Sequence, residues 1–190
     1  MTPPHRASGG RAAAQPARSG TPLAQLARVG VLSDTHGLLR PEAVAALAGS
    51  ELLVHAGDIG AAGILPALRA IAPLVAIRGN NDTAEWAAGV PATATAQWGA
   101  VRLYVVHDRA DLELDPRAAG IHVVISGHSH RPAIEHRDGV LYVNPGSCGP
   151  RRFSLPVTVA RLTLHGTRVE AEIVDVMTGR PGQTTATFTQ

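Results

Sequence analysis

The stretch Val29–Gly37 (VGVLSDTHG) decides the fold of this chain. Its short apolar run passes directly into the polar loop Asp34-Thr35-His36-Gly37. Such a run is typical of a buried strand that carries polar groups at its C-terminal edge. Pro41–Leu47 then predicts a helix, because Pro stands in its first turn and Gly49 follows its end.

The same alternation continues through the first half of the chain. Leu52–His55 and Leu74–Ile77 are predicted strands, and Ile64–Ile71 is a predicted helix between them. This βαβαβ pattern indicates neighbouring parallel strands joined by helical crossovers. The second half is rich in strands and hairpins, with expected strands at Thr93–Trp98, Val101–Val106, Ile121–Ser126, Ala133–His136, Leu141–Val143, Val157–Leu164 and Arg168–Val176. One further short helix is expected at Asp115–Ala119.

Composition divides the 190 residues into one domain and two flanking segments. Residues 1–27 are expected to be a disordered extension, because Pro, Gly, Ser, Ala and Arg dominate and no apolar periodicity supports packing. Residues 28–177 form the predicted domain, and residues 178–190 are expected to be a frayed tail. Residues 1–28 hold four arginines and no acid, so the formal charge of the remaining chain is −2 although the whole chain carries +2.

This distribution of residues argues against several classes of function. No apolar run reaches the 18 residues of a membrane span, so no membrane partner is expected. Six aromatic residues and a mildly acidic body disfavour a nucleic-acid partner. Cys148 is the only cysteine, which excludes an internal disulfide or a cysteine-rich zinc site. We expect a cytoplasmic protein.

Seven polar side chains follow the predicted strands, each in a short loop, and the C-terminal edge of such a sheet gathers these loops. They are Asp34, His36, Asp58, Asn80, His107, His128 and His130. Mixed oxygen and imidazole donors suit Mn, Fe, Ni or Zn better than Mg or Ca. Seven donors exceed what one ion uses, so we expect two ions that share a carboxylate. Asp58 is the best bridging candidate because it stands alone on its loop.

These motifs resemble those of the calcineurin-like metallophosphoesterases. The matching segments are Asp34-x-His36, Gly57-Asp58, Gly79-Asn80-x-Asp82, His107 and Gly127-His128-Ser129-His130. Asn144-Pro145-Gly146-Ser147, followed by Pro150-Arg151, further resembles the small YfcE-type phosphodiesterases. The resemblance implies an α/β fold, a four-layer α/β/β/α sandwich with two mixed sheets.

The resemblance also implies a ligand set and a reaction. One metal would be held by Asp34, His36, Asp58 and His130, and the second by Asp58, Asn80, His107 and His128. The cofactors would be two divalent ions, with manganese as the first choice and nickel, iron, cobalt or zinc as alternatives. A metal-bridging hydroxide would hydrolyse a small-molecule phosphoester, most simply a phosphodiester. Asp58, Asn80 and Asn81 are the expected catalytic residues.

Two positions depart from the pattern of this family. Asn81 stands where many members have a histidine that protonates the leaving group, and an amide cannot act as that acid. We expect Asn81 to donate a hydrogen bond to the phosphate, and the enzyme to favour stable leaving groups. Asp108 stands where glycine is common, and it either orients His107 as a hydrogen-bond acceptor or covers the site and repels anions. Arg109 either pairs with Asp108 or binds the substrate phosphate.

Several alternatives remain open at this point. A protein-interaction scaffold has a precedent on this fold in the retromer subunit Vps29, whose metal site is degraded, whereas all seven ligand positions are present here. A phosphomonoesterase or a nuclease would use the same centre. Strand edges in the second half of the chain also make a homo-oligomer a candidate. Arg151 and Arg152 either grip an anion or lie solvated at the surface, Asp82 either braces its loop or contacts substrate, and His55 is expected to be structural.

Overall fold

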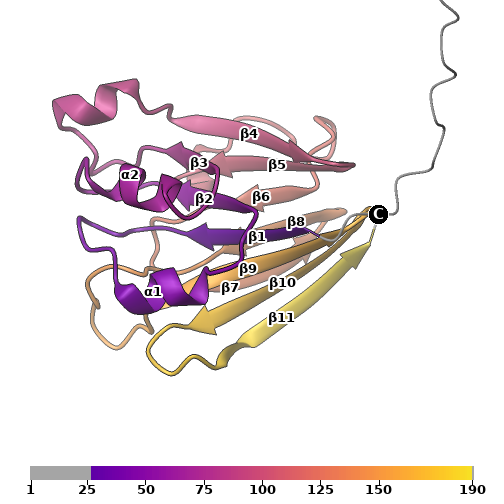
Figure 1. Ribbon diagram of the computed structural model, residues 1–190. Helices are drawn as coiled ribbons and strands as arrows, with labels where there is room; N and C mark the ends of the chain where they lie inside the picture. Colours follow the sequence, from indigo (N-terminus) through magenta and orange to yellow (C-terminus); the bar gives the residue numbers. More distant parts are fainter. Residues whose placement is uncertain (1–26, 190) are drawn as a thin grey trace, which may run out of the picture.

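The computed structural model describes residues 27–189, which form two mixed β-sheets packed face to face (Figure 1). The first sheet has the strand order β11-β10-β9-β1-β2-β3 and the second has the order β4-β5-β6-β8-β7. The first sheet consists of β1 (Ala27–Leu32), β2 (Leu52–Ala56), β3 (Leu74–Ile77), β9 (Thr158–His165), β10 (Arg168–Asp175) and β11 (Pro181–Thr189). The second consists of β4 (Thr93–Trp98), β5 (Val101–Val106), β6 (Val123–Ile125), β7 (Ala133–Arg137) and β8 (Val140–Asn144). The segment predicted to be a disordered extension, residues 1–27, lies outside the described residues except for Ala27, which is buried and begins β1.

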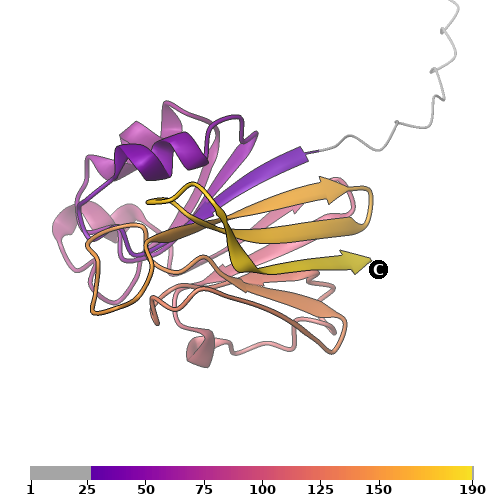
Figure 2. The same cartoon turned by 90° about the horizontal axis from the view of Figure 1, so that it is seen from below.

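Helices α1 and α2 cover the outer face of the first sheet (Figure 2). Helix α1 spans Pro41–Ala46 and α2 spans Ile64–Arg69, and the 3-10 helices η1 and η2 span Glu85–Gly89 and Arg109–Asp111. No helix in the described region is long and apolar enough to cross a membrane.

Alternation along the strands produces two main apolar layers. Val29, Val31 and Val54 point between the two sheets, where they meet Leu103 and Ile125 of the second sheet. Residues of opposite parity, including Leu32 and Leu53, pack instead against the helices. The two mixed sheets expected from the resemblance are therefore confirmed.

The layer over the outer face of the second sheet is thin. Buried Val124 and Val140 lie there beneath the loop that contains η2. The expected helix at Asp115–Ala119 is wrong, because this segment makes only one hydrogen-bonded turn. The Asp115 carboxylate caps that turn by accepting hydrogen bonds from the backbone N–H groups of Arg117 and Ala118. Gly120, at φ +66°, then turns the chain away before a second turn forms.

The expected frayed tail is also wrong, because its backbone forms strand β11 antiparallel to β10. A tight turn reverses the chain between these strands. Asp175 accepts hydrogen bonds from the backbone N–H groups of Met177 and Thr178 through its side chain and from that of Gly179 through its carbonyl. This Asx turn supplies the reversal, and apolar periodicity gives no sign of it because the turn is formed by a polar side chain.

The parallel strands of both sheets end at the same edge of the sandwich. Pairs β1/β2, β2/β3, β5/β6 and β6/β8 are parallel. The arrowheads of β1, β2, β3, β5 and β6 all lie at the left of Figure 1. The loops that follow these strands therefore meet at a single rim of the sandwich, which is where a ligand site is expected.

Candidate metal centre

The predicted ligands occupy unusual backbone conformations at this rim. Seven non-glycine residues in the described region have positive φ, and five of them are predicted ligands. These five are Asp34 (φ 56°), His36 (44°), Asp58 (54°), His128 (65°) and His130 (58°). A left-handed conformation at a residue with a Cβ costs about 1–3 kcal/mol and persists where the surroundings enforce it, commonly at functional sites. The loops are therefore shaped to aim these side chains rather than to relax the chain.

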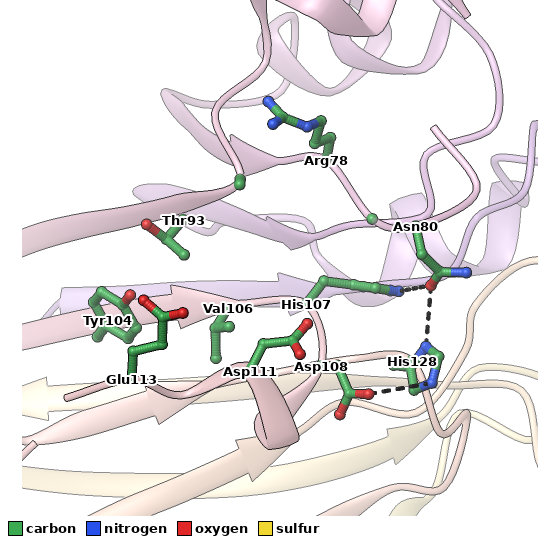
Figure 3. A pocket seen from close by; sticks show the side chains of 12 residues that line it. Arg78, Asn80, Thr93, Tyr104, Val106, His107, Asp108, Asp111, Glu113 and His128 are labelled. Atoms are coloured by element: carbon green, nitrogen blue, oxygen red, sulfur yellow. Dashed lines mark hydrogen bonds and ion pairs between the residues drawn. The ribbon is translucent and has the colours of Figure 1, made fainter. Parts of the chain in front are cut away.

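The seven predicted ligands form one unbroken chain of contacts. It begins with His130 Nε2, which lies 3.2 Å from Asp34 Oδ1 and 3.3 Å from His36 Nε2. His36 Nε2 lies 3.7 Å from Asp58 Oδ2, which in turn lies 3.4 Å from His107 Nε2. Asn80 Oδ1 completes the series at 3.1 Å from both His107 Nε2 and His128 Nδ1 (Figure 3). Residues up to 96 positions apart in the sequence thus converge as the resemblance implies.

The environment of Asp34 fits a bound cation. Both of its carboxylate oxygens are buried and have no hydrogen-bond partner among the described residues. A buried carboxylate without donors is strongly unfavourable unless a positive charge compensates it. One ligand atom each from Asp34, His36 and His130 lie within 4.8 Å of one another, as do those of Asp34, Asp58 and His107. Both the donor set and the unsatisfied oxygens match a divalent ion.

Asp58 lies between the two groups and is held in its charged form. Burial favours the neutral acid, but hydrogen bonding to His107 and Asn81 outweighs it and keeps the pKa of Asp58 well below its usual range. Asn81 donates its backbone N–H to Asp58 Oδ1 at 2.9 Å and its side-chain amide to Oδ2 at 2.6 Å. The structure thus gives the Asn81 amide a carboxylate partner, whereas a phosphate contact was expected.

The histidines offer suitable lone pairs. The Nδ1–H of His107 donates to the Ala56 carbonyl at 2.7 Å, which directs Nε2 toward Asp58 and Asn80. Although burial opposes protonation, the Asp58 carboxylate and the Ala56 carbonyl raise the pKa of His107, so a cation would compete with that proton. Burial lowers the pKa of His36, with a further contribution from Arg152, so this ring is neutral and available at pH 7.

Close backbone packing fixes the Asp58 loop against the Asn80 loop. A Cβ on Gly79 would collide with the Asp58 side chain and backbone, so only glycine fits here. Asp82 then ties the same loops together by accepting backbone N–H groups from Ile59 at 3.0 Å, Gly60 at 2.8 Å and Gly79 at 2.8 Å. Of the two interpretations of Asp82, the structure supports the bracing one.

His55 is a second brace, buried beneath the ligand loops. Its Nδ1 accepts the Gly57 backbone N–H at 3.2 Å, and its Nε2 contacts the Thr35 hydroxyl at 2.9 Å. The Thr35 hydroxyl itself donates to the Ile59 carbonyl, so Nε2–H is the donor in this contact. Complete burial lowers the pKa of His55 to about 4, against the opposing charges of Asp34 and Asp82. This neutral ring confirms the structural role expected from sequence.

Acidification should destabilise the metal-free protein through His55. The pKa of His55 is about 4 when folded and close to its ordinary value when unfolded, so below about pH 6.5 the unfolded chain binds a proton that the folded protein excludes. We expect the free energy of unfolding to fall by about 3 kcal/mol between roughly pH 6.5 and 4 from this group. Urea unfolding across this pH range should show a flatter dependence for His55→Gln, whereas His165→Gln, an exposed control, should keep the parent slope. Equal slopes for the parent and His55→Gln would contradict the assignment.

The Asn144-Pro145-Gly146-Ser147 segment supports two ligand loops. Asn144 Nδ2 donates to the Gly127 carbonyl at 2.6 Å, and Ser147 Oγ donates to the Asp34 carbonyl at 2.9 Å. Gly149 follows with no room for a Cβ, since one would collide with the Asp34 and Thr35 carbonyls. Contact this close holds the next loop, residues 150–156, beside the centre.

Arg152 in that loop is the site residue on which sequence reasoning did not decide. Its Nη2 lies 3.3 Å from His36 Nε2, at the edge of the ligand cluster. A guanidinium has no lone pair and cannot ligate a metal, so it faces the centre as a fixed positive charge. The available signal was the Pro150-Arg151 match, but Arg151 instead donates to the Leu155 carbonyl within the loop.

A cavity of about 470 Å³ opens beside Asn80, His107 and His128 (Figure 3). Its wall includes Tyr104 and Thr93, and its acidic lining residues are Asp108, Asp111 and Glu113. The centre therefore has an arginine at one side and a carboxylate-lined hollow at the other.

The expectations for Asp108 and Arg109 are corrected here. The Asp108 carboxylate lies 3.4 Å from His128 Nε2, so the ligand it faces is His128 and not His107. Arg109 does not pair with Asp108, because its guanidinium forms an ion pair with Glu135 at 2.8 Å and stacks over the Tyr142 ring. Since these contacts occupy the guanidinium, we do not retain Arg109 as a substrate-binding residue.

Similarity to known proteins agrees with this centre. The sequence pattern of the calcineurin-like phosphoesterase superfamily domain matches residues 28–167. A probable metallophosphoesterase of Methanothermobacter thermautotrophicus is 33% identical over 165 residues, which cover 80% of this chain and 94% of that protein. This chain belongs to the calcineurin-like phosphoesterase superfamily.

Other proteins similar to this chain differ in what they are named for. A phosphodiesterase of Methanocaldococcus jannaschii is 26% identical over 64% of this chain and 84% of its own length. Vps29 of Cryptosporidium parvum has the same fold, with a TM-score of 0.74, 18% identity and coverage of 87% and 99% of the two chains. Vps29 of Entamoeba histolytica, in a structure with Zn²⁺, matches at 0.68 with 19% identity over 85% and 99%. The Escherichia coli phosphoesterase YfcE matches at 0.65 with 20% identity over 84% and 98%. The fold is thus confirmed, and it is shared by a phosphoesterase and by Vps29 proteins.

Proposed function

We propose that this chain is a phosphodiesterase whose centre holds two divalent ions bridged by Asp58. The observation that carries the proposal is the continuous series of contacts among the seven candidate ligands. One of them, Asp34, has buried carboxylate oxygens with no hydrogen-bond partner among the described residues. Asp34, His36, Asp58 and His130 would hold one ion, and Asp58, Asn80, His107 and His128 the other. Manganese is the proposed metal, and the location is proposed to be the cytoplasm.

The chemistry of this centre divides between the ions and the chain. Two adjacent divalent ions, when bound, lower the pKa of a water between them and neutralise charge on a phosphoryl group. Asn81 holds the Asp58 carboxylate by two hydrogen bonds and has a second amide N–H left for a phosphate oxygen. Asn80 contributes a neutral oxygen, which leaves more positive charge on its ion than a second carboxylate would. The Cys148 thiol is buried and its pKa is raised to about 12, so a cysteine nucleophile is not part of this mechanism.

Charge around the centre favours a diester over a monoester. A phosphodiester carries one negative charge at pH 7, whereas a phosphomonoester carries close to two. Asp108, Asp111 and Glu113 line the cavity beside the centre and repel additional negative charge. Arg78 also lines this cavity, but it is outnumbered by the three carboxylates and donates to the Val90 carbonyl, while Arg152 faces the centre from the other side. These surroundings are suited to a singly charged phosphate flanked by two alcohol groups.

Arg152 is expected to bind a phosphate oxygen of the substrate. Arg152→Gln should raise KM for a diester about tenfold or more with a smaller change in kcat, because a charged hydrogen bond is worth about 1.5–3 kcal/mol. Steady-state kinetics with bis-p-nitrophenyl phosphate measure both constants. Arg168→Gln, at an exposed position in the β9–β10 hairpin, is the matched control and should leave both constants unchanged. A parent-like KM for Arg152→Gln would remove this residue from the site.

A protein-interaction scaffold is the second candidate, and the Vps29 fold matches favour it. Metal binding alone does not separate the two functions, since one of these Vps29 structures contains Zn²⁺. Turnover does separate them. The complete donor set argues for the enzyme.

The deciding experiment is a hydrolysis screen with metal-stripped protein reloaded with Mn²⁺, Ni²⁺, Co²⁺, Zn²⁺ or Mg²⁺. The substrates are bis-p-nitrophenyl phosphate, p-nitrophenyl phosphate, single-stranded DNA and a series of aryl diesters of decreasing leaving-group acidity. We expect metal-dependent cleavage of the diesters, with rates that decline along the series because Asn81 supplies no proton. Absence of turnover with every metal would favour the scaffold, and preferential cleavage of the monoester or of DNA would replace the proposed substrate class.

A further inference from the structure

The Asp108 carboxylate lies against a nitrogen of His128 that does not face the ligand cluster. Imidazole nitrogens point in divergent directions, and His128 Nδ1 is directed at Asn80 Oδ1 while Nε2 lies 3.4 Å from Asp108 Oδ2 (Figure 3). The side chains of both residues are partly exposed, at 45% for His128 and 35% for Asp108. Packing alone therefore does little to orient the His128 ring.

A comparison within the centre shows what such a contact does. His107 donates its Nδ1–H to the Ala56 carbonyl, and this bond leaves Nε2 facing the other ligands. A neutral imidazole carries one proton, so an acceptor on one nitrogen keeps the lone pair on the other. In His128 the Nε2 atom lies 3.4 Å from Asp108 Oδ2, within reach of an acceptor, while Nδ1 lies 3.1 Å from Asn80 Oδ1, on the side where an ion would take up the Nδ1 lone pair.

Asp108 is itself held in place. Its Oδ1 accepts the Ala110 backbone N–H at 2.9 Å and thereby caps η2, which leaves Oδ2 free to face His128. The side chain follows His107 directly, so one loop supplies a ligand and a carboxylate that orients another ligand.

We propose that Asp108 is a positioning residue that fixes the Nε2–H form of His128 and so strengthens the second metal site. This inference rests on the proposed function, because it assumes that Nδ1 of His128 binds an ion. It replaces the expectation that Asp108 orients His107, since the carboxylate faces His128.

The test is a Mn²⁺ titration of metal-stripped protein, with free Mn²⁺ measured by electron paramagnetic resonance. Asp108→Ser keeps a side-chain oxygen that caps Ala110 but cannot reach His128, and it should weaken one of the two Mn²⁺ ions by about 10–100-fold. Asp108→Asn keeps the cap through its single carbonyl oxygen but turns an NH₂ donor toward His128 Nε2, so it should weaken the same Mn²⁺ about as much as Asp108→Ser does. Asp111→Ser removes the same charge from the same cavity without touching His128, and it should bind as the parent does.

The outcomes are distinguishable. A parent that binds fewer than two Mn²⁺ ions contradicts the proposed function itself. If the parent binds two ions and Asp108→Ser binds both as tightly, only the role of Asp108 fails. Parent-like binding of both ions by Asp108→Asn also overturns it, because that variant turns a donor instead of an acceptor toward His128. Circular dichroism of the metal-free variants confirms that each is folded before titration.

Discussion

Replacing Asp58 with asparagine should lower kcat for a phosphodiester by at least about 10³-fold, the scale on which two-metal centres and preorganised charge act. Asp58 Oδ2 faces His36 in one half of the centre and His107 in the other, so no second residue takes over its position. Its pKa is held well below the usual range by hydrogen bonds, so it supplies a negative charge at every pH of interest. An amide of the same shape removes that charge and turns a donor toward the ions.

The measurement for Asp58 is initial rates in saturating Mn²⁺, together with metal content after gel filtration. We expect Asp58→Asn to retain at most one ion per chain. Asp115→Asn is the matched control, because Asp115 caps a turn remote from the ligands and asparagine caps it equally well. Retention of more than about a tenth of the parental kcat would show that the bridging role is misassigned.

Replacing Asp34 with asparagine should stabilise the metal-free protein and remove most of the stabilisation that Mn²⁺ gives the parent. In the metal-free protein the two Asp34 oxygens are buried without hydrogen-bond donors, so the neutral amide should stabilise it by about 1–3 kcal/mol. Asparagine also tolerates the left-handed conformation at this position, where φ is 56°. The backbone therefore gives no reason for the variant to be less stable.

Thermal unfolding with and without Mn²⁺ measures both effects as changes in Tm. Mn²⁺ at 100 times its dissociation constant contributes about 2.7 kcal/mol per site, so each occupied site raises the Tm of the parent by roughly 5–10 °C. Asp34→Asn should have the higher Tm without metal and should gain little on addition of Mn²⁺. A lower metal-free Tm together with an undiminished Mn²⁺ shift would show that Asp34 is a structural residue.

Much of the fold follows from local patterns that a reader of the sequence can identify. Strands β3, β4 and β5 have the predicted bounds because each is an apolar or alternating run that ends at a glycine or polar signal. The ligand loops were predictable because each places a carboxylate, an amide or an imidazole directly after such a run. Strand β11 and the turn at 115–120 were not predictable in this way, since side-chain caps decide both.

The contacts around the ligands required the structure. Asn81 reaches Asp58 across 23 positions, and Arg152 reaches His36 across 116. Asp108 faces His128 rather than the adjacent His107 because its other oxygen caps η2. Such choices depend on the relative placement of loops from two sheets, which periodicity and spacing do not encode.

The most direct test of the two-ion centre is anomalous scattering from crystals soaked in Mn²⁺. The account predicts two peaks, about 3.5–4 Å apart, with Asp58 between them, His130 beside one and His128 beside the other. A single peak, or peaks that Asp58 does not contact, would contradict it.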